Sequence, residues 1–316
     1  MVKRSIIQKS VELGFGNCGF ARCEPLEELR TFYDRFVSEK RFASMQYLER
    51  YAGQRLDPAL VMPGAKTVIG LAMNYCPAEP IPEDDNFIIA KYAYGRDYHK
   101  LMRVKLDDLA AFMRNSLGAV NTRVFVDSGA LLEKAWAQRC GIGWQGKNTL
   151  VINKKQGSFF FIGIILTDLE IEPDPAETDH CGECEKCVKA CPSGALDSPC
   201  QLDIPRCISY LTIESRNAAQ GEPEGNLSGR IYGCDICQDV CPYNRHSPAH
   251  NTPEFVPSDM LVKMRKKDWI ALAEEDFNLL FAGSPVMRVG YAAFMKNVMT
   301  CQACVLPGGP PGRPPG

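Results

Sequence analysis

The order of hydrophobic and polar positions predicts alternating strands and helices in the first half of the chain. Three short runs of branched and apolar residues, typical of buried strands, cover 65–73, 122–126 and 159–166. Apolar residues at helical spacing predict helices over 98–117 and 131–138. Residues 1 to about 50 are expected to form helices around a turn at 14–16. Strands alternating with helices predict an α/β layered domain over 1–170.

The second half of the chain has a different pattern. An acidic, proline-bearing segment at 172–175 precedes a cysteine-rich region, and helical spacing returns after Cys241 and continues to about Val298. The final segment contains proline, glycine and one arginine from 307 onward, and we expect it to be disordered. Three further parts are therefore expected after the first domain: a cysteine module over 171–250, a helical segment over 251–300 and a tail over 301–316.

Composition and charge narrow the class of protein. Of the 316 residues, 45% are hydrophobic and 23% are charged, which is typical of a globular protein with a real core. The formal net charge of −2 gives no overall attraction for nucleic acid, so such a partner would need a local basic patch. The chain has neither a secretory pattern after Met1 nor an apolar run of bilayer length, which predicts a cytoplasmic protein without a membrane partner.

The 15 cysteines indicate metal ligation, because cytoplasmic thiols are kept reduced. One run has the bacterial ferredoxin spacing C-x2-C-x2-C-x3-C-P and consists of Cys181, Cys184, Cys187 and Cys191 before Pro192. A second run has the last three cysteines of that pattern: Cys234, Cys237 and Cys241 before Pro242. Ile231 stands where the first cysteine of the second run is expected.

The ferredoxin rule assigns these cysteines to two [4Fe–4S] clusters, because the fourth cysteine of each run ligates the other cluster. The first cluster takes Cys181, Cys184, Cys187 and Cys241, and the second takes Cys191, Cys234 and Cys237. Cys200 and Cys207 are the candidates for the missing eighth ligand. Cys207 is favoured because it opens an apolar segment, whereas Cys200 follows Ser198-Pro199 in a turn. A zinc site made of paired CxxC units is the alternative, and the x3-Cys-Pro endings argue against it.

Two motifs in the first domain resemble binding sites only in part. The run 141–147 fits G-x-G-x-x-G, but a helical segment precedes it and Asn148 stands where a phosphate loop needs Ser or Thr. We interpret it as a glycine loop that lets backbone approach a ligand, with Lys147 and Asn148 as polar contacts. Asp97-Tyr98-His99 begins like a cobalt-ligating D-x-H-x-x-G motif, but Met102 replaces the glycine, so His99 is interpreted as a polar residue at a helix start.

Asp127 follows the apolar strand that ends at Val126. A carboxylate there can cap the next helix, or it can act as a general acid if a partly apolar pocket favours its protonated form. The residues alone favour the cap.

Several segments together resemble the epoxyqueuosine reductase family. In the first domain they are MQYL at 45–48, RLDP at 55–58, PGAK at 63–66, MNY at 73–75, YGRDYH at 94–99, DSG at 127–129 and GIGWQGKNT at 141–149. In the cysteine module they are RCISYLTIE at 206–214 and GCDICQ at 233–238. The resemblance covers about 1–298.

The resemblance implies an α/β (α+β) fold in which a nitroreductase-like cobalamin-binding domain, related to reductive dehalogenases, precedes a ferredoxin-like double [4Fe–4S] module and C-terminal helices. The implied reaction is the last step of queuosine biosynthesis, the two-electron removal of the epoxide oxygen from epoxyqueuosine at the tRNA wobble position. A flavodoxin or ferredoxin system would deliver electrons through the clusters to cobalamin, a cofactor suited to such chemistry. A monomer is expected.

The resemblance also implies roles for individual residues. It places Cys207 in the second cluster and Asp127 at the proposed proton donor, which favours the acid over the cap. Such an acid must keep its proton near neutrality, which requires burial to outweigh charge stabilisation. The implied corrin contacts are Arg55, Tyr98, Lys147, Asn148 and Ser158, with Ser209 and Thr212 near the clusters.

The tRNA would be held mainly through its phosphates. Lys263, Arg265, Lys266 and Lys267 form the densest basic run, although a solvated helix face explains them equally well. Many family members continue into a C-terminal helical-repeat region that this sequence lacks, which implies a smaller footprint on the tRNA.

Two other functions compete with this one. A reductive dehalogenase-like enzyme would act on a small molecule, but such enzymes carry an export signal and a membrane partner. A non-catalytic, ferredoxin-type electron carrier would need neither Asp127 nor the glycine loop, and it would bind no corrinoid.

Overall fold

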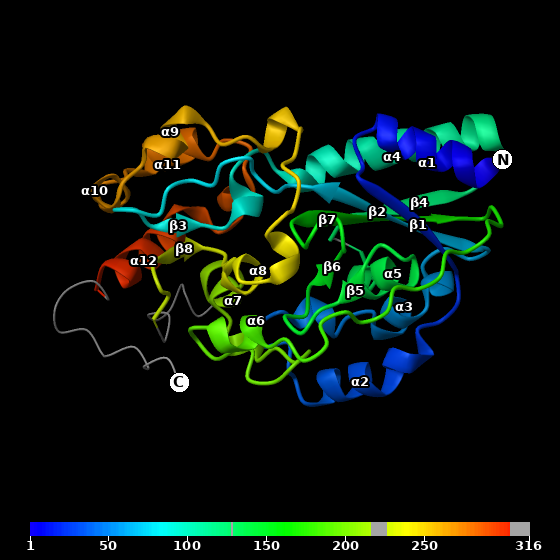
Figure 1. Ribbon diagram of the computed structural model, residues 1–316, viewed down its shortest axis with the longest axis horizontal. Helices are drawn as coiled ribbons and strands as arrows, with labels where there is room; N and C mark the ends of the chain where they lie inside the picture. The colour runs from blue at the N-terminus through cyan, green and yellow to red at the C-terminus, as the bar shows by residue number, and fades with distance from the viewer. Residues whose placement is uncertain (128, 216–225, 304–316) are drawn as a thin grey trace. The chain divides into compact units, whose positions relative to one another are not determined.

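The computed structural model describes residues 1–127, 129–215 and 226–303 (Figure 1). It divides into two compact units. Unit 1 contains Met1–Tyr75, Tyr98–Cys184 and Pro242–Pro248. Unit 2 contains Cys76–Asp97, Glu185–Cys241 and the described residues from Ala249 onward.

These units interleave along the chain, whereas the expected domains were contiguous, with boundaries at 170, 250 and 300. The difference arises because strand β3 (Ile88–Ile89) leaves the first part of the chain to pair in parallel with β8 (Arg230–Tyr232) in unit 2. The expected tail also begins too early, since helix α12 (Gly290–Ala303) includes its first residues. The rest of that tail, 304–316, lies outside the described residues.

Unit 1 is built on a four-stranded antiparallel sheet with the order β1-β2-β7-β4. The strands are β1 (Asn17–Arg22), β2 (Thr67–Asn74), β4 (Thr122–Phe125) and β7 (Phe160–Thr167). Because β2 and β7 are buried along nearly their whole length, both faces of the central sheet must be covered. The three strands and two helices expected between 65 and 166 are confirmed.

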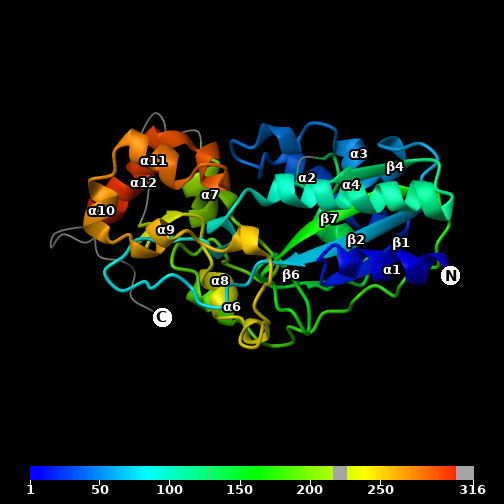
Figure 2. The same cartoon turned by 90° about the horizontal axis from the view of Figure 1, so that it is seen from above.

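Helices cover the two faces of this sheet. Helices α1 (Val2–Glu12) and α4 (Tyr98–Leu117) pack on one face, and they lie over the strands when seen from above (Figure 2). Helix α5 (Glu133–Arg139) packs on the other face, where α2 (Glu27–Ser38) and α3 (Ala52–Leu56) also lie (Figure 1). The core on that face includes the fully buried Trp136 and Leu166.

The expectation that residues 1–50 are helical missed strand β1. This edge strand has no apolar alternation, and its conformation is fixed by pairing with β2. Gly19 allows the strand to lie against α5, since a Cβ added there would be 1.8 Å from the carbonyl oxygen of Cys140. Because the conformation of β1 depends on tertiary contacts, the spacing of apolar residues along the sequence does not predict this strand.

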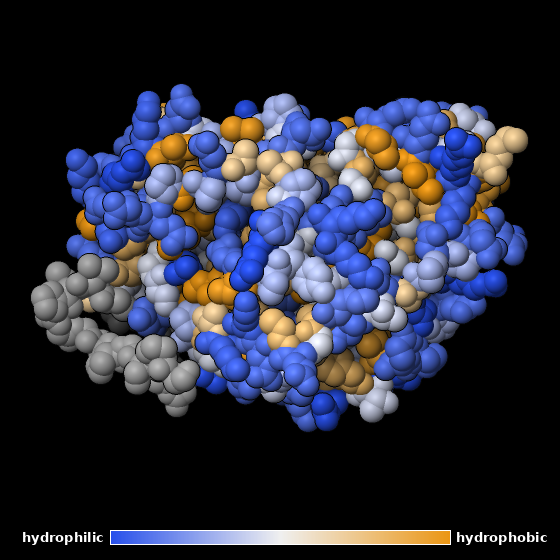
Figure 3. Space-filling view, in the orientation of Figure 1, coloured by the Kyte–Doolittle hydropathy of each residue, from blue (hydrophilic) through white to orange (hydrophobic). Residues whose placement is uncertain are grey.

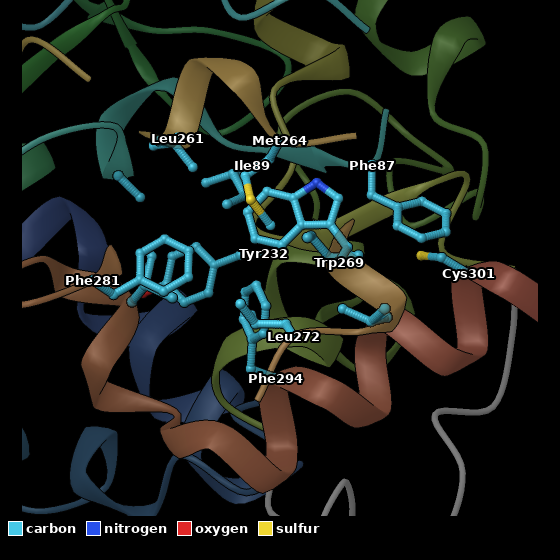
Figure 4. Close-up of a cluster of buried hydrophobic side chains, with 14 of the residues drawn as sticks. Phe87, Ile89, Tyr232, Leu261, Met264, Trp269, Leu272, Phe281, Phe294 and Cys301 are labelled. Atoms are coloured by element: carbon cyan, nitrogen blue, oxygen red, sulfur yellow. The ribbon is translucent and has the colours of Figure 1, made fainter. Parts of the chain in front are cut away.

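Unit 2 combines the β3–β8 pair with short helices. Those around the cysteines are α6 (Lys186–Ala190), α7 (Ile208–Ile213) and α8 (Ile236–Asp239), and those near the C-terminus are α9 (Asp259–Lys263), α10 (Lys266–Ile270), α11 (Glu274–Leu280) and α12. The helices expected after Cys241 are thus confirmed. Trp269 packs among Phe281, Phe294 and Tyr232 in an aromatic core (Figure 4). Its Nε1 donates a hydrogen bond to Asn86 Oδ1 at 2.7 Å, which satisfies the buried indole.

On the face seen in Figure 3, hydrophilic residues surround separate hydrophobic spots, as is usual for globular proteins. Within the part of the chain that the structure describes, no helix combines the length and apolar character needed to cross a membrane.

Candidate active site and cluster-binding cysteines

Asp127 lies on the loop between β4 and α5, at the edge of an open pocket of about 750 Å³ in unit 1. Its φ angle of +52° is in the left-handed region, which a non-glycine residue adopts at an energetic cost. The cap of α5 is instead Leu132, and no side chain caps that helix. The interpretation of Asp127 as a helix cap is therefore wrong.

The side chains around Asp127 come from the start of α4. Tyr98 donates a hydrogen bond from its hydroxyl group to Asp127 Oδ2, and His99 Nε2 lies 3.5 Å from the same oxygen. The Tyr98 ring is buried and stacks on Phe161, with ring centroids 3.8 Å apart. His99 stands at a helix start as expected, but its place beside Asp127 was missed. The YGRDYH motif was the available signal for it.

Burial of Asp127 itself does not meet the requirement expected for the acid. Its side chain is 50% exposed, so a substrate in the pocket can reach the carboxyl group. Groups next to Asp127 must therefore supply the proton that its carboxyl group would donate.

Arginines dominate the charge of the pocket. Its lining includes Arg50, Arg55, Arg103 and Arg123, with Asp127 as the one acidic residue among the described lining residues. The buried Arg55 donates to Tyr47 O at 2.9 Å and to Gly129 O at 3.3 Å, which ties the Asp127 loop to the segment before α3. Positive charge around an open pocket suits a ligand with phosphate groups.

The other expected corrin contacts of unit 1 do not line this pocket. Asn148 is buried, and its Oδ1 accepts a hydrogen bond from Leu150 N at 3.2 Å. Ser158 is buried against Asn244, whose Nδ2 donates to Ser158 Oγ at 2.9 Å. Lys147 is half-buried.

The glycine loop is a β-hairpin of β5 (Trp144–Gln145) and β6 (Val151–Ile152). Because no helix follows it, the rejection of a nucleotide loop is confirmed. Close approach to a ligand is not what requires the glycines. A Cβ added at Gly143 would lie 2.2 Å from Ile152 O, and one at Gly146 would lie 2.3 Å from Ile152 Cδ1. The two glycines allow the strands of the hairpin to pack together.

This hairpin presents Trp144 to a predicted cluster ligand. Trp144 is fully buried, and its Nε1 lies 3.4 Å from Cys181 Sγ, to which it donates a hydrogen bond. The rings of His180 and Tyr243 contact the indole edge-on. Hydrogen bonds to cysteine sulfur are one way in which a protein sets the potential of an iron–sulfur cluster.

The cysteines assigned to the two clusters are distributed differently between the units. Cys191, Cys207, Cys234 and Cys237 all belong to unit 2, whereas the first set has Cys181 and Cys184 in unit 1 and Cys187 and Cys241 in unit 2. Within unit 2, Cys207, Cys234 and Cys237 are close enough to interact electrostatically. Cys200 is exposed on a turn with a φ of +61°.

The chemistry of this sulfur set suits a cluster. Burial raises the pKa of Cys234 to about 11 and that of Cys237 well above its usual range. Thiolates at these positions therefore need a positive partner, which cluster iron supplies. In the ranges covered by the structure, no three His, Cys, Asp or Glu side chains converge on a single ion. A cubane cluster does not require such a site, because each of its cysteines binds a different iron.

Thr212 holds the chain beside Cys234. Its Oγ1 accepts a hydrogen bond from Gly233 N at 2.9 Å and donates to Ile208 O at 2.8 Å. Asn297 of α12 donates from Nδ2 to Thr212 O and to Ile231 O, both at 3.0 Å. Ser209, in α7, is half-buried. Thr212 thus positions the loop before Cys234.

Comparisons with known proteins find matches in both halves of the chain. Residues 55–128 match the family model "Epoxyqueuosine reductase QueG, DUF1730", and residues 180–244 match the "4Fe-4S double cluster binding domain". An epoxyqueuosine reductase of Cellulophaga algicola is 41% identical over 290 residues, covering 92% of this chain and 94% of the relative.

Two solved structures are also similar. A crystal structure of epoxyqueuosine reductase with an epoxyqueuosine-modified tRNA-Tyr stem loop has a TM-score of 0.80 and 30% identity, covering 95% of this chain and 80% of the other. The enzyme of Bacillus subtilis, with a catalytic aspartate loop swung out of the active site, has a TM-score of 0.80 and 28% identity, covering 95% and 81%.

Replacing Cys207 tests the eighth ligand. We expect Cys207→Ala to lower the iron content from about eight to about four atoms per chain, because the second cluster loses a ligand. Cys200→Ala is the matched control and should keep about eight. Iron and sulfide analysis of anaerobically reconstituted protein measures both, and equal iron loss in the two variants would contradict the assignment.

Replacing Trp144 tests the hydrogen bond to Cys181. We expect Trp144→Phe to lower the midpoint potential of one cluster by on the order of tens of millivolts, because the reduced cluster loses a donor. Trp136→Phe is the control, since Trp136 is equally buried and its Nε1 has no hydrogen-bond partner. A redox titration followed by electron paramagnetic resonance measures both, and equal potentials in the two variants would argue against tuning by Trp144.

Proposed function

This chain belongs to the epoxyqueuosine reductase family and is therefore an oxidoreductase, and from that premise we propose that it removes the epoxide oxygen of epoxyqueuosine at the tRNA wobble position. The observation that carries the proposal is Asp127, half exposed at the arginine-rich pocket and hydrogen-bonded to Tyr98. A relative of similar fold is known with an epoxyqueuosine-modified tRNA stem loop.

The reaction sets clear chemical demands. Converting an epoxide to an alkene and water consumes two electrons and two protons. Two [4Fe–4S] clusters bound by ferredoxin-like cysteines transfer electrons singly, so the pocket needs a cofactor that accepts them and acts on carbon.

We assign that role to cobalamin, which when bound supplies reduced cobalt as a strong nucleophile. The pocket fits such a group in two respects. Its volume is about 750 Å³, and the buried Arg55 in its lining provides a polar contact. The expected contacts Lys147, Asn148 and Ser158 are not part of this proposal for the pocket, because none of them is among its lining residues.

The residues of the chain supply the acid and its orientation. Asp127 donates a proton to the oxygen as the carbon–oxygen bond breaks, which removes the developing negative charge. Tyr98 fixes the direction of the carboxyl group by hydrogen bonding to Oδ2. Arg55 holds the same loop through Gly129 O.

The tRNA is held through phosphate contacts. The arginines Arg50, Arg103 and Arg123 line the same pocket as Asp127, and in this proposal they bind phosphates of the anticodon loop. In the basic run, Arg265 caps α10 and donates to the backbone oxygens of Val262 and Met264. That leaves the exposed Lys263 and Lys267 as its better phosphate contacts.

Three further features belong to the proposal. A flavodoxin or ferredoxin system is the electron donor, which suits clusters that accept one electron at a time. The protein acts as a monomer in the cytoplasm, where modified tRNA is available.

Anaerobic reconstitution tests the function. Protein given iron, sulfide and cobalamin should hold about eight irons and one corrinoid per chain, and with a chemical reductant it should convert epoxyqueuosine in a tRNA stem loop to queuosine. Iron and cobalt content, the visible spectrum and nucleoside mass spectrometry provide the readouts. Eight irons without corrinoid binding or conversion would indicate an electron carrier instead.

Replacing Asp127 tests the acid. We expect Asp127→Asn to lower the rate of conversion by about 10²- to 10⁴-fold, the usual contribution of general acid catalysis, with iron and corrinoid content unchanged. Asp108→Asn, on the exposed face of α4, is the control and should keep the wild-type rate. Full turnover by the Asp127 variant would show that another group provides the proton.

A further inference from the structure

Glu133 brings a second carboxyl group to the Asp127 loop. It is the first residue of α5, and its Oε1 atom is buried without a hydrogen-bond partner although the residue as a whole is only half-buried. An ionised carboxylate with an unsatisfied, buried oxygen is strongly destabilised, whereas a protonated carboxyl group is tolerated. The surroundings of Glu133 therefore favour the protonated form.

Glu133 lies beside Asp127. Its carboxyl group is within interaction range of both the side chain and the backbone of Asp127. Burial, followed by the negative charge of Asp127, raises the pKa of Glu133 well above its usual range, while the charge of Arg55 opposes this. Two carboxyl groups that share a site in this way retain at least one proton between them.

The two carboxyl groups differ in access. Asp127 is 50% exposed at the pocket, whereas the Oε1 atom of Glu133 is closed to solvent. The other titratable or charged groups at the pair are Arg55 from α3 and Tyr98 and His99 from α4. Asp127 combines a positive φ with a place in the lining of the pocket.

We propose that Glu133 holds the proton of the pair and passes it to Asp127, which delivers it to the epoxide oxygen. This rests on the proposed function. The substrate takes two electrons from the clusters and their donor, and both carbon–oxygen bonds break. The first proton passes from Glu133 to Asp127 and then to the oxygen. Solvent protonates the pair again, and the second proton follows the same route before water leaves.

The test uses the full chain with its clusters and cobalamin reconstituted. Glu133→Gln keeps the size and polarity of the side chain but carries no transferable proton. We expect the kcat for conversion of the stem loop to fall by about 10- to 100-fold, with KM unchanged, because Asp127 must then be reloaded from solvent. The alkaline limb of the kcat–pH profile should move to lower pH by about one unit, because the carboxyl group that retains a proton is lost.

Two variants control for structural effects. Glu27→Gln makes the same substitution at the first residue of another helix, α2, where the carboxylate is exposed and pairs with Arg30. This variant should keep the wild-type rate and pH profile. Glu133→Asp keeps a carboxyl group that is one methylene shorter, and it should recover part of the lost rate.

The pH dependence of unfolding provides a readout without catalysis. Because the pKa of Glu133 is raised in the folded state, the folded protein holds a proton that the unfolded chain has released. The wild-type free energy of unfolding should therefore fall as pH rises from the ordinary glutamate pKa towards the folded pKa. That decline should be smaller in Glu133→Gln and in Asp127→Asn. Urea unfolding across this pH range measures it.

The outcomes separate the two proposals. Wild-type protein without turnover would overturn the proposed function, and the proposed role of Glu133 with it. A Glu133→Gln variant with wild-type kcat and an unmoved alkaline limb would overturn the proposed role of Glu133 alone. A uniform loss of rate at every pH, with the wild-type pH dependence of unfolding, would assign Glu133 a purely structural role and also overturn it.

Discussion

The geometry of the pocket depends on the antiparallel pairing of β7 with β2 and β4. β2 and β7 are buried along nearly their whole length, so the register of the sheet is held by packing on both faces. Strand β4 pairs with β7 up to Phe125, and the chain turns two residues later at Asp127. Helix α4 packs on the same strands and brings Tyr98 to that turn. The acid is thus placed by a rigid sheet although it lies on a loop.

The carboxyl groups of Asp127 and Glu133 differ in their access to solvent, and this difference suits them to different roles. An acid that meets substrate must be accessible, yet access to water favours its ionised form. Asp127 provides the access, and Glu133 behind it provides a carboxyl group whose surroundings favour the proton. Arg55, which donates to Gly129 O, stabilises the loop that keeps the two groups together.

The cysteines of unit 2 pose a different physical problem, because helices as short as α6, α7 and α8 are not stable by themselves. Side-chain hydrogen bonds to the backbone compensate. Thr212 holds Gly233, and Asn297 holds the backbone of Thr212 and Ile231. The aromatic core around Trp269 supports α12, which carries Asn297. Cluster formation supplies further stability, because buried thiolates need cationic partners.

The sequence by itself determined the features whose signals are local. Ligand spacing predicts the cluster cysteines, the apolar segment after Cys207 favours it over Cys200, and periodicity located β2, β7 and α4, because these signals depend on neighbouring residues. Tertiary structure alone decided the rest. β1 is a strand because β2 pairs with it, and 76–97 joins unit 2 because β3 pairs with a strand far along the chain. Whether Asp127 caps a helix or faces a pocket, and whether Glu133 is buried, depends on loop geometry that no local pattern encodes.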